Sequence, residues 1–298
     1  KIISLKKIHT LPTSCKNKVK HDLKNIVIKR KNFLNNVNFL EPSIMGILNL
    51  TPDSFSDGGK FNNQKKAKSH IYNMIKDGAN IIDIGGESTR PGADKISIEK
   101  EIGRVIPLVK EISKHGNVSI DTRHSEVAKL AIEAGATMIN DVSGLREQSM
   151  FDLVLESGCH VCIMHMLGEP GNMQDNPQYE DVSNEVNSML ISKARELVES
   201  GHSMDKIFLD PGIGFGKSLQ HNIDLLQSSS ELRPYSVLWG VSRKSMIGEI
   251  CSQPDTENRL AGSLAVAAKA YYDKIDIIRV HDVREHVDLF STLEALER

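Results

Sequence analysis

Eight short apolar runs, separated by longer amphipathic stretches, constrain the fold of this chain more than any other feature. The runs are rich in Ile and Val, which is typical of parallel strands buried on both faces. They are Ile44–Asn49, Asn80–Gly86, Val118–Thr122, Thr137–Gly144, His160–His165, Ile207–Gly212, Val237–Arg243 and Ile278–Asp282, the last preceded by Ile277. The stretches between them have the periodicity of surface helices, and several end at a glycine, as helices commonly do.

Eight strand–helix units in one chain of 298 residues predict an α/β fold, a TIM-type (β/α)8 barrel. A doubly wound open sheet is the alternative. We expect the barrel to occupy residues 43–298. Residues 1–42 are basic and rich in Lys and Asn, and we interpret them as an extension, a linker or the tail of an upstream domain.

Composition excludes several function classes. The chain is 39% apolar and 26% charged, as expected of a soluble globular protein, and its formal net charge of -2 gives no overall attraction to nucleic acid or membrane. No apolar run approaches the roughly 20 residues of a membrane-spanning helix. Cys159 and Cys162 have an odd separation in a strand-like run, so we expect buried thiols on opposite faces; a metal or redox role of this C-x-x-C is the alternative. This cysteine usage predicts a reducing, cytoplasmic location.

Polar side chains stand at the carboxyl end of nearly every predicted strand. In a barrel of this kind the active site is built from those ends. One aspartate after a strand is most often a helix cap or a turn former. A whole rim of such groups instead predicts a polar pocket, and its members are Asn49, Asp83, Asp121, Asn140, Asp141, His165, Asp210, Arg243, Lys244, Arg279 and His281.

The residue types divide this rim into two sets. Asp121, Asn140, Asp210 and Lys244 suit a flat heterocycle with an edge of N–H and C=O groups. Asn49, Arg279 and His281 suit a phosphate-bearing group with its Mg²⁺, which commonly keeps one or two protein oxygens and binds phosphate for the rest. His165 could be a ligand, but we favour a packed residue or one that supports a ligand. The chain has no zinc-ligand spacing, no Walker A motif and no G-x-S-x-G, and DPGIGFGK lacks the G-x-G-x-x-G spacing.

Eight motifs in order carry a resemblance to a known family. They are MGILNLTPDSFSDGG, IIDIGGESTRPG, SIDT, INDVSG, MHM, DPGIGFGK, SRKS and RVHDV. From about Ser43 to its end the chain resembles dihydropteroate synthase, of the pterin-binding barrel group. The departure is the long lead-in before Glu41. Some members of the family are fused behind hydroxymethyldihydropterin pyrophosphokinase, so we expect a fragment of such a bifunctional protein.

The resemblance implies a reaction in folate biosynthesis. In it, 4-aminobenzoate displaces pyrophosphate from 7,8-dihydropterin-6-ylmethyl diphosphate to give 7,8-dihydropteroate, by a dissociative, SN1-like path. It implies that Asp121, Asn140, Asp210 and Lys244 hold the pterin. It implies that Asn49, with Mg²⁺, binds the diphosphate together with Thr89, Arg90, Arg279 and His281. The catalytic set implied is Asn49, Asp57, Asp121, Asp210, Lys244, Arg279 and His281.

The resemblance also explains the polar stretch LTPDSFSDGG, which looks like the family's first mobile loop. Phe55 becomes a wall for the aminobenzoate ring, and Asp57 orders the closed loop. The aminobenzoate set implied is Phe55, Pro91, Phe215, Gly216, Lys217 and Ser245. Phe55 as a plain hydrophobic anchor of its loop is the alternative. Sulfonamides, which mimic 4-aminobenzoate, are expected to compete at this set.

Two other functions remain open from the residues alone. A methyltransferase of the pterin-binding group would share the pterin set but lack a pyrophosphate site, and TPDSFSDGG and SRKS argue against it. A non-enzymatic scaffold would have lost site residues, and none is lost. The family forms homodimers, for which the apolar last helices could supply the surface.

Overall fold

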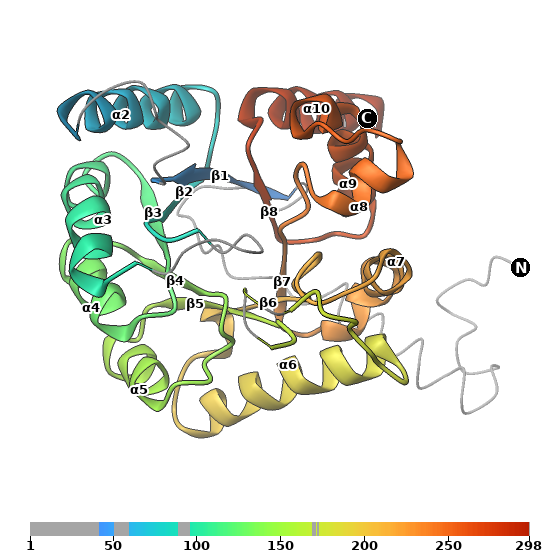
Figure 1. The fold of residues 1–298 in the computed structure, drawn as a ribbon, viewed down its shortest axis with the longest axis horizontal. Helices are drawn as coiled ribbons and strands as arrows, with labels where there is room; N and C mark the ends of the chain where they lie inside the picture. Colours follow the sequence, from blue (N-terminus) through green and yellow to red (C-terminus); the bar gives the residue numbers. More distant parts are fainter. Residues whose placement is uncertain (1–41, 51–59, 89–95, 169–170, 172, 298) are drawn as a thin grey trace, which may run out of the picture.

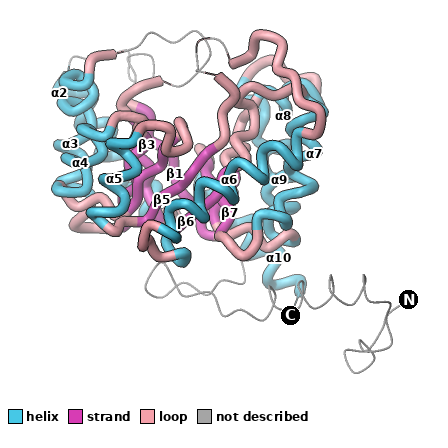
Figure 2. The backbone as a smooth tube through the Cα atoms, turned by 90° about the horizontal axis from the view of Figure 1, so that it is seen from below, coloured by secondary structure: helices cyan, strands magenta, loops and turns pink. Residues whose placement is uncertain are grey.

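The computed structural model describes residues 42–50, 60–88, 96–168, 171 and 173–297. In this part of the chain eight parallel strands close into a barrel in the order β1 to β8, with β1 paired to β8 (Figure 1). The helices surround the strands, as the side view of Figure 2 shows. The barrel prediction is confirmed, and closure excludes the open sheet. Among the described residues, no helix is both long and apolar enough to cross a membrane.

The strands and helices alternate as the sequence predicts. The strands are β1 (Ser43–Asn49), β2 (Ile81–Gly85), β3 (Asn117–Asp121), β4 (Met138–Asp141), β5 (His160–Met164), β6 (Ile207–Asp210), β7 (Ser236–Trp239) and β8 (Ile277–Val280). The α-helices are α2 (Lys60–Lys76), α3 (Ile98–Ile112), α4 (Ser125–Glu133), α5 (Gln148–Ser157), α6 (Val182–Glu199), α7 (Leu219–Ser228), α8 (Ser245–Ile250), α9 (Leu260–Tyr272) and α10 (Val283–Glu297).

Several strands are shorter than the apolar runs that predicted them. The run Val237–Arg243 pairs as a strand only to Trp239, and the backbone of Arg243 has a positive φ of 59°. A left-handed residue cannot continue a strand. The polar tips of the motifs therefore belong to the loops above the barrel, where they are free to face a ligand.

Two separate apolar clusters explain how the barrel is filled. One residue from each of seven strands forms the inner cluster of Met45, Ile81, Met138, Cys162, Phe208, Leu238 and Ile277. The larger cluster lies between the strands and the surrounding helices and contains Cys159. Cys159 and Cys162 are buried free thiols that belong to different clusters, which confirms the expected opposite faces. The inner cluster closes the barrel below its polar mouth.

Strand register places polar residues in one row at the carboxyl ends. Asn49 is paired with Gly85, Gly85 with Asp121, and Asp121 with Asn140. Gly85 leaves space in this row, because a Cβ at that position would lie 3.5 Å from both Asn49 Oδ1 and Asp121 Oδ2. Neighbouring strands thus bring together groups that are up to 91 residues apart in sequence.

Candidate active site

An arginine shared by two carboxylates forms the centre of the barrel mouth. Arg279 Nε donates to Asp83 Oδ2 at 2.6 Å, and Arg279 Nη2 donates to Asp121 Oδ2 at 2.7 Å. Asn140 Nδ2 donates to the same Asp83 oxygen at 3.1 Å. The structure thus brings Arg279 into contact with a predicted pterin residue, Asp121. Its predicted role at the diphosphate stays a prediction.

Burial opposes charge in this cluster. It raises the pKa of Asp121 to about 7, although the Arg279 guanidinium pulls that pKa down. Burial also lowers the pKa of Arg279, but the carboxylates of Asp83 and Asp121 outweigh it and raise the net value above the usual range. The cluster therefore holds a permanent cation beside a carboxyl group that changes its protonation near neutral pH.

The sequence places Asp83 on the polar rim, but we gave it no ligand or catalytic role there. Its side chain is fully buried and meets both Arg279 and Asn140. Its Oδ1 atom has no hydrogen-bond partner in the described part of the chain. The signal was present, because a charged residue in the middle of the run IIDIG can be buried only with a partner.

Asp210 and Lys244 face the same space from β6 and from the loop after β7. Asp210 Oδ1 accepts from the backbone N–H of Gly212 at 2.8 Å, and burial raises the pKa of Asp210. Lys244 Nζ lies 4.0 Å from the centre of the Phe215 ring, a cation–π contact. Burial lowers the pKa of Lys244 to about 8, although Asp210 opposes this. Burial disfavours the charged forms of Asp210, the acceptor, and of Lys244, the donor. Such a pair suits recognition of a neutral heterocycle.

Lys217 holds the loop that carries Phe215. The Lys217 side chain is 4% exposed, and its Nζ lies 3.0 Å from His165 Nδ1 and 2.9 Å from the carbonyl oxygen of Phe215. Burial lowers the pKa of Lys217 to about 7 and that of His165 to about 3. His165 is therefore neutral and accepts, and its packed role agrees with the sequence interpretation. Tyr179 adds a hydrogen bond from its hydroxyl to the Gly216 carbonyl, 2.9 Å long.

Asn49, His281 and Ser245 complete the described part of the rim. Asn49 ends β1 and is half-buried. His281 Nδ1 lies 3.2 Å from Ser242 Oγ, which also accepts from the His281 backbone N–H at 3.2 Å. Ser245 is exposed and is the first residue of α8. Each of these groups stands at the end of a strand or helix that opens on the mouth.

Five predicted site residues lie outside the described residues: Phe55, Asp57, Thr89, Arg90 and Pro91. Their predicted roles stay predictions.

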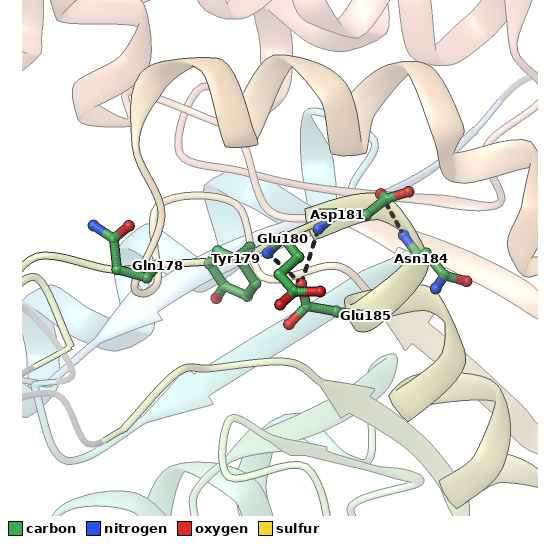
Figure 3. A pocket seen from close by; sticks show the side chains of 6 residues that line it. All are labelled: Gln178, Tyr179, Glu180, Asp181, Asn184 and Glu185. Carbon is green, nitrogen blue, oxygen red and sulfur yellow. Dashed lines mark hydrogen bonds between the residues drawn. The ribbon is translucent and has the colours of Figure 1, made fainter.

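A pocket of about 440 Å³ lies elsewhere, at the start of α6 (Figure 3). Its lining is Gln178, Tyr179, Glu180, Asp181, Asn184 and Glu185, none of them a predicted site residue. Glu185 Oε1 accepts from the backbone N–H groups of Glu180 and Asp181, at 2.8 and 3.0 Å, and Asp181 Oδ1 accepts from that of Asn184 at 3.0 Å. These bonds cap the helix, so the acidic lining serves local structure.

Comparison with known proteins decides the family. The model for "Pterin binding enzyme" matches residues 45–281. Dihydropteroate synthase of Escherichia coli (strain K12) is 46% identical over 258 residues, which cover 85% of this chain and 91% of that protein. The chain belongs to the dihydropteroate synthase family. This confirms the resemblance drawn from the eight motifs, and the methyltransferase alternative loses its support. Dihydropteroate synthases are transferases.

Two further dihydropteroate synthases place the chain within the family. The crystal structure of Yersinia pestis dihydropteroate synthase with a sulfonamide drug complex matches with a TM-score of 0.81 and 42% identity, over 88% of this chain and 96% of that one. A mitochondrial folate synthesis bifunctional protein of Arabidopsis thaliana is 40% identical over 274 residues, 86% of this chain but 50% of that protein. Related barrels thus occur both alone and joined to a second part.

Proposed function

We propose that this chain condenses 7,8-dihydropterin-6-ylmethyl diphosphate with 4-aminobenzoate to give 7,8-dihydropteroate and pyrophosphate. The observation that carries the proposal is the joint presence at one barrel mouth of the row Asn49, Asp121 and Asn140 and of the facing pair Asp210 and Lys244. The family supplies the reaction, and these residues supply its binding groups.

The pterin ring is bound by hydrogen bonds along its polar edge. The carboxyl groups of Asp121 and Asp210 accept from ring N–H groups, Asn140 matches both donor and acceptor, and Lys244 donates to the ring carbonyl. A mismatched ring would leave these buried groups unpaired, which gives strong discrimination. Fixing the ring orients its exocyclic carbon and removes much of the entropic part of the barrier.

The diphosphate is bound by Asn49, Arg279 and His281, with Thr89 and Arg90. The Asn49 amide oxygen, a hard ligand of the kind that Mg²⁺ prefers, lies beside the space at Gly85. The described residues contain no group of three His, Cys, Asp or Glu side chains that could hold a metal ion. This donor set fits a Mg²⁺ that takes one protein oxygen and phosphate oxygens for the rest. Mg²⁺ bound there would neutralise part of the negative charge of the diphosphate.

The reaction breaks a C–O bond before the new C–N bond is complete. The electron pair of the C–O bond leaves with pyrophosphate, whose charge Arg279 and His281 stabilise. The electron-rich dihydropterin delocalises the cation left on the exocyclic carbon, and the carboxylates of Asp121 and Asp210 stabilise it. The neutral aryl amine then attacks, and the ammonium formed loses its proton to solvent. No general base in the protein is required.

The aminobenzoate ring lies between Phe215, with Gly216 and Lys217, and the predicted walls Phe55 and Pro91, where Asp57 orders the first loop. Its carboxylate is near Ser245 at the start of α8. A sulfonamide drug bound to the Yersinia relative supports a shared pocket for these mimics. Competition of a sulfonamide with 4-aminobenzoate in a steady-state assay tests this placement, and absence of competition by every sulfonamide tried would argue against it.

Pyrophosphate release from the dihydropterin diphosphate is the decisive experiment. We expect Mg²⁺-dependent release, and formation of 7,8-dihydropteroate when 4-aminobenzoate is added. Release without Mg²⁺ would refute the metal role alone. Failure of the folded protein to release pyrophosphate under any of these conditions would refute the proposed reaction.

The assembly and location of the protein are part of the same proposal. We infer a homodimer formed through the last helices, a cytoplasmic location and an upstream pyrophosphokinase, the last supported by the bifunctional relative from Arabidopsis. Light scattering tests the dimer, and cell fractionation tests the location. The sequence of the complete transcript tests the fusion.

A further inference from the structure

Arg243 has an unusual backbone between two residues of the mouth. Its φ of 59° is left-handed, a conformation that a non-glycine residue adopts at a cost and keeps only when its surroundings determine it. The preceding residue, Ser242, contacts both the ring and the backbone of His281. The following residue, Lys244, contacts Phe215. A change at Arg243 would therefore move both neighbours.

The side chains of three residues hold the left-handed turn. The Arg243 backbone N–H donates to Ser263 Oγ in α9 at 3.0 Å, and Arg259 Nη1 donates to the Arg243 carbonyl oxygen at 3.0 Å. The Arg243 side chain forms a two-bond ion pair with Asp282, with Nε donating to Oδ2 at 3.0 Å and Nη2 donating to Oδ1. Asp282 directly follows His281, so this pair ties the loop after β7 to the loop after β8.

We propose that Arg243 is a positioning residue of the reaction, which fixes Lys244 and His281 relative to each other through its left-handed backbone and its ion pair with Asp282. The inference rests on the proposed function for its kinetic consequence, but its geometry stands without it. The planar guanidinium matches a carboxylate with two parallel bonds, which a lysine cannot do. Lys244 and His281 come from adjacent strands, and in the described residues Arg243–Asp282 is the ion pair that joins their loops.

The same two strands carry a matched ion pair at their other end. Arg233 precedes β7, Asp276 precedes β8, and Arg233 Nη1 donates to Asp276 Oδ2. That pair is more buried than Arg243–Asp282, with side chains 10% and 3% exposed against 29% and 12%. It lies at the end of the strands away from the mouth. A merely structural role would make the two pairs equivalent in their effect on turnover.

The test compares R243K and D282N, singly and together, with R233K as the control. We expect R243K and D282N each to lower kcat/KM for the dihydropterin diphosphate by about 10- to 100-fold, because a displacement near 1 Å can cost about that much. The KM for 4-aminobenzoate should change by less. The double variant should be no worse than either single variant, because both remove one interaction. R233K should lose thermal stability and keep kcat/KM within about twofold.

Amide hydrogen exchange on the same variants separates this inference from the proposed function. We expect R243K to speed exchange in peptides that cover Gly240–Ile247 and Arg279–Val283, and R233K to leave those peptides unchanged. Equal kinetic effects of R243K and R233K, or unchanged exchange in R243K, would overturn the positioning role. The wild-type protein could lack turnover while R243K still shows the faster exchange. This result would refute the proposed reaction but would still support the positioning of the loops by Arg243.

Discussion

At the amino-terminal end of β7 and β8, Arg233 pairs with Asp276, and at the carboxyl end of the same strands, Arg243 pairs with Asp282. The first pair is bonded within the two strands, because the Asp276 carboxylate also accepts from the backbone N–H of Val237 in β7 at 2.8 Å. The second pair supports residues that face an open mouth. The same strand pair thus carries one ion pair away from the mouth and another beside residues of the proposed active site.

Burial shifts the pKa values of several groups around the mouth. Around the mouth, burial brings the pKa of Asp121 to about 7, that of Lys217 to about 7 and that of Lys244 to about 8. Groups whose charged form is unfavourable gain most from a ligand that completes their hydrogen bonds. The mouth is therefore prepared for a ligand at some cost to the unliganded fold.

The largest expected effect comes from breaking the buried pairs at both ends. Asp83→Asn and Asp276→Asn each weaken a buried arginine–carboxylate pair, which typically costs about 3–5 kcal/mol of unfolding free energy. Urea unfolding should show similar losses for both, while only Asp83→Asn should lower kcat/KM, by about 100-fold or more. A loss of turnover in folded Asp276→Asn of the same size would contradict the contrast between the two ends.

Removing the cation of Lys244, a proposed pterin ligand, should affect turnover more than stability. Lys244→Met keeps an unbranched side chain and removes the donor, so we expect kcat/KM for the dihydropterin diphosphate to fall by about 100- to 1,000-fold. Thermal unfolding should change little, because a cation held in an unfavourable environment is lost. Lys269→Met, on the exposed side of α9, is the matched control and should behave as wild type. A decrease in kcat/KM smaller than about tenfold would exclude Lys244 as a main pterin ligand.

The raised pKa of Asp121 predicts a pH dependence of stability. The folded state keeps this proton up to pH about 7, whereas the unfolded state loses it near its ordinary value of 3.8. The folded state binds more protons in this window, so the group's contribution to stability falls as pH rises from about 4 to 7. The slope is at most about 1.4 kcal/mol per pH unit. Asp121→Asn should flatten the stability profile, and an unchanged profile would refute the shift.

The smallest expected effect comes from loosening the loop that carries Phe215. Tyr179→Phe removes the hydrogen bond to Gly216, a bond worth about 1 kcal/mol. We expect the KM for 4-aminobenzoate to rise by up to about fivefold, with the KM for the dihydropterin diphosphate unchanged. Tyr272→Phe is the control, because that side chain is exposed on α9. A larger change in the KM for the pterin substrate would place Tyr179 in a different role.

The sequence was sufficient for the barrel because each strand and helix carries its own pattern. The row Asn49, Asp121 and Asn140 followed from the rule that strand ends share one rim. The pairing of Arg279 with Asp83 did not follow, since it joins residues 196 positions apart and depends on closure between β1 and β8. The left-handed backbone of Arg243 could not be predicted from the sequence either, because contacts from α9 and Asp282 determine it.

Gly85 is a position at which a single mutation could change the shape of the barrel mouth. A methyl group there would lie 3.5 Å from Asn49 Oδ1 and Asp121 Oδ2, which is ordinary van der Waals contact. Alanine is therefore compatible with the fold, and it even reduces the entropy of the unfolded chain. It would nevertheless fill part of the space between Asn49 and Asp121, two proposed ligand-binding residues. Substitution of Gly85 is thus a change that a screen for stability would pass and a screen for ligand or inhibitor affinity would detect.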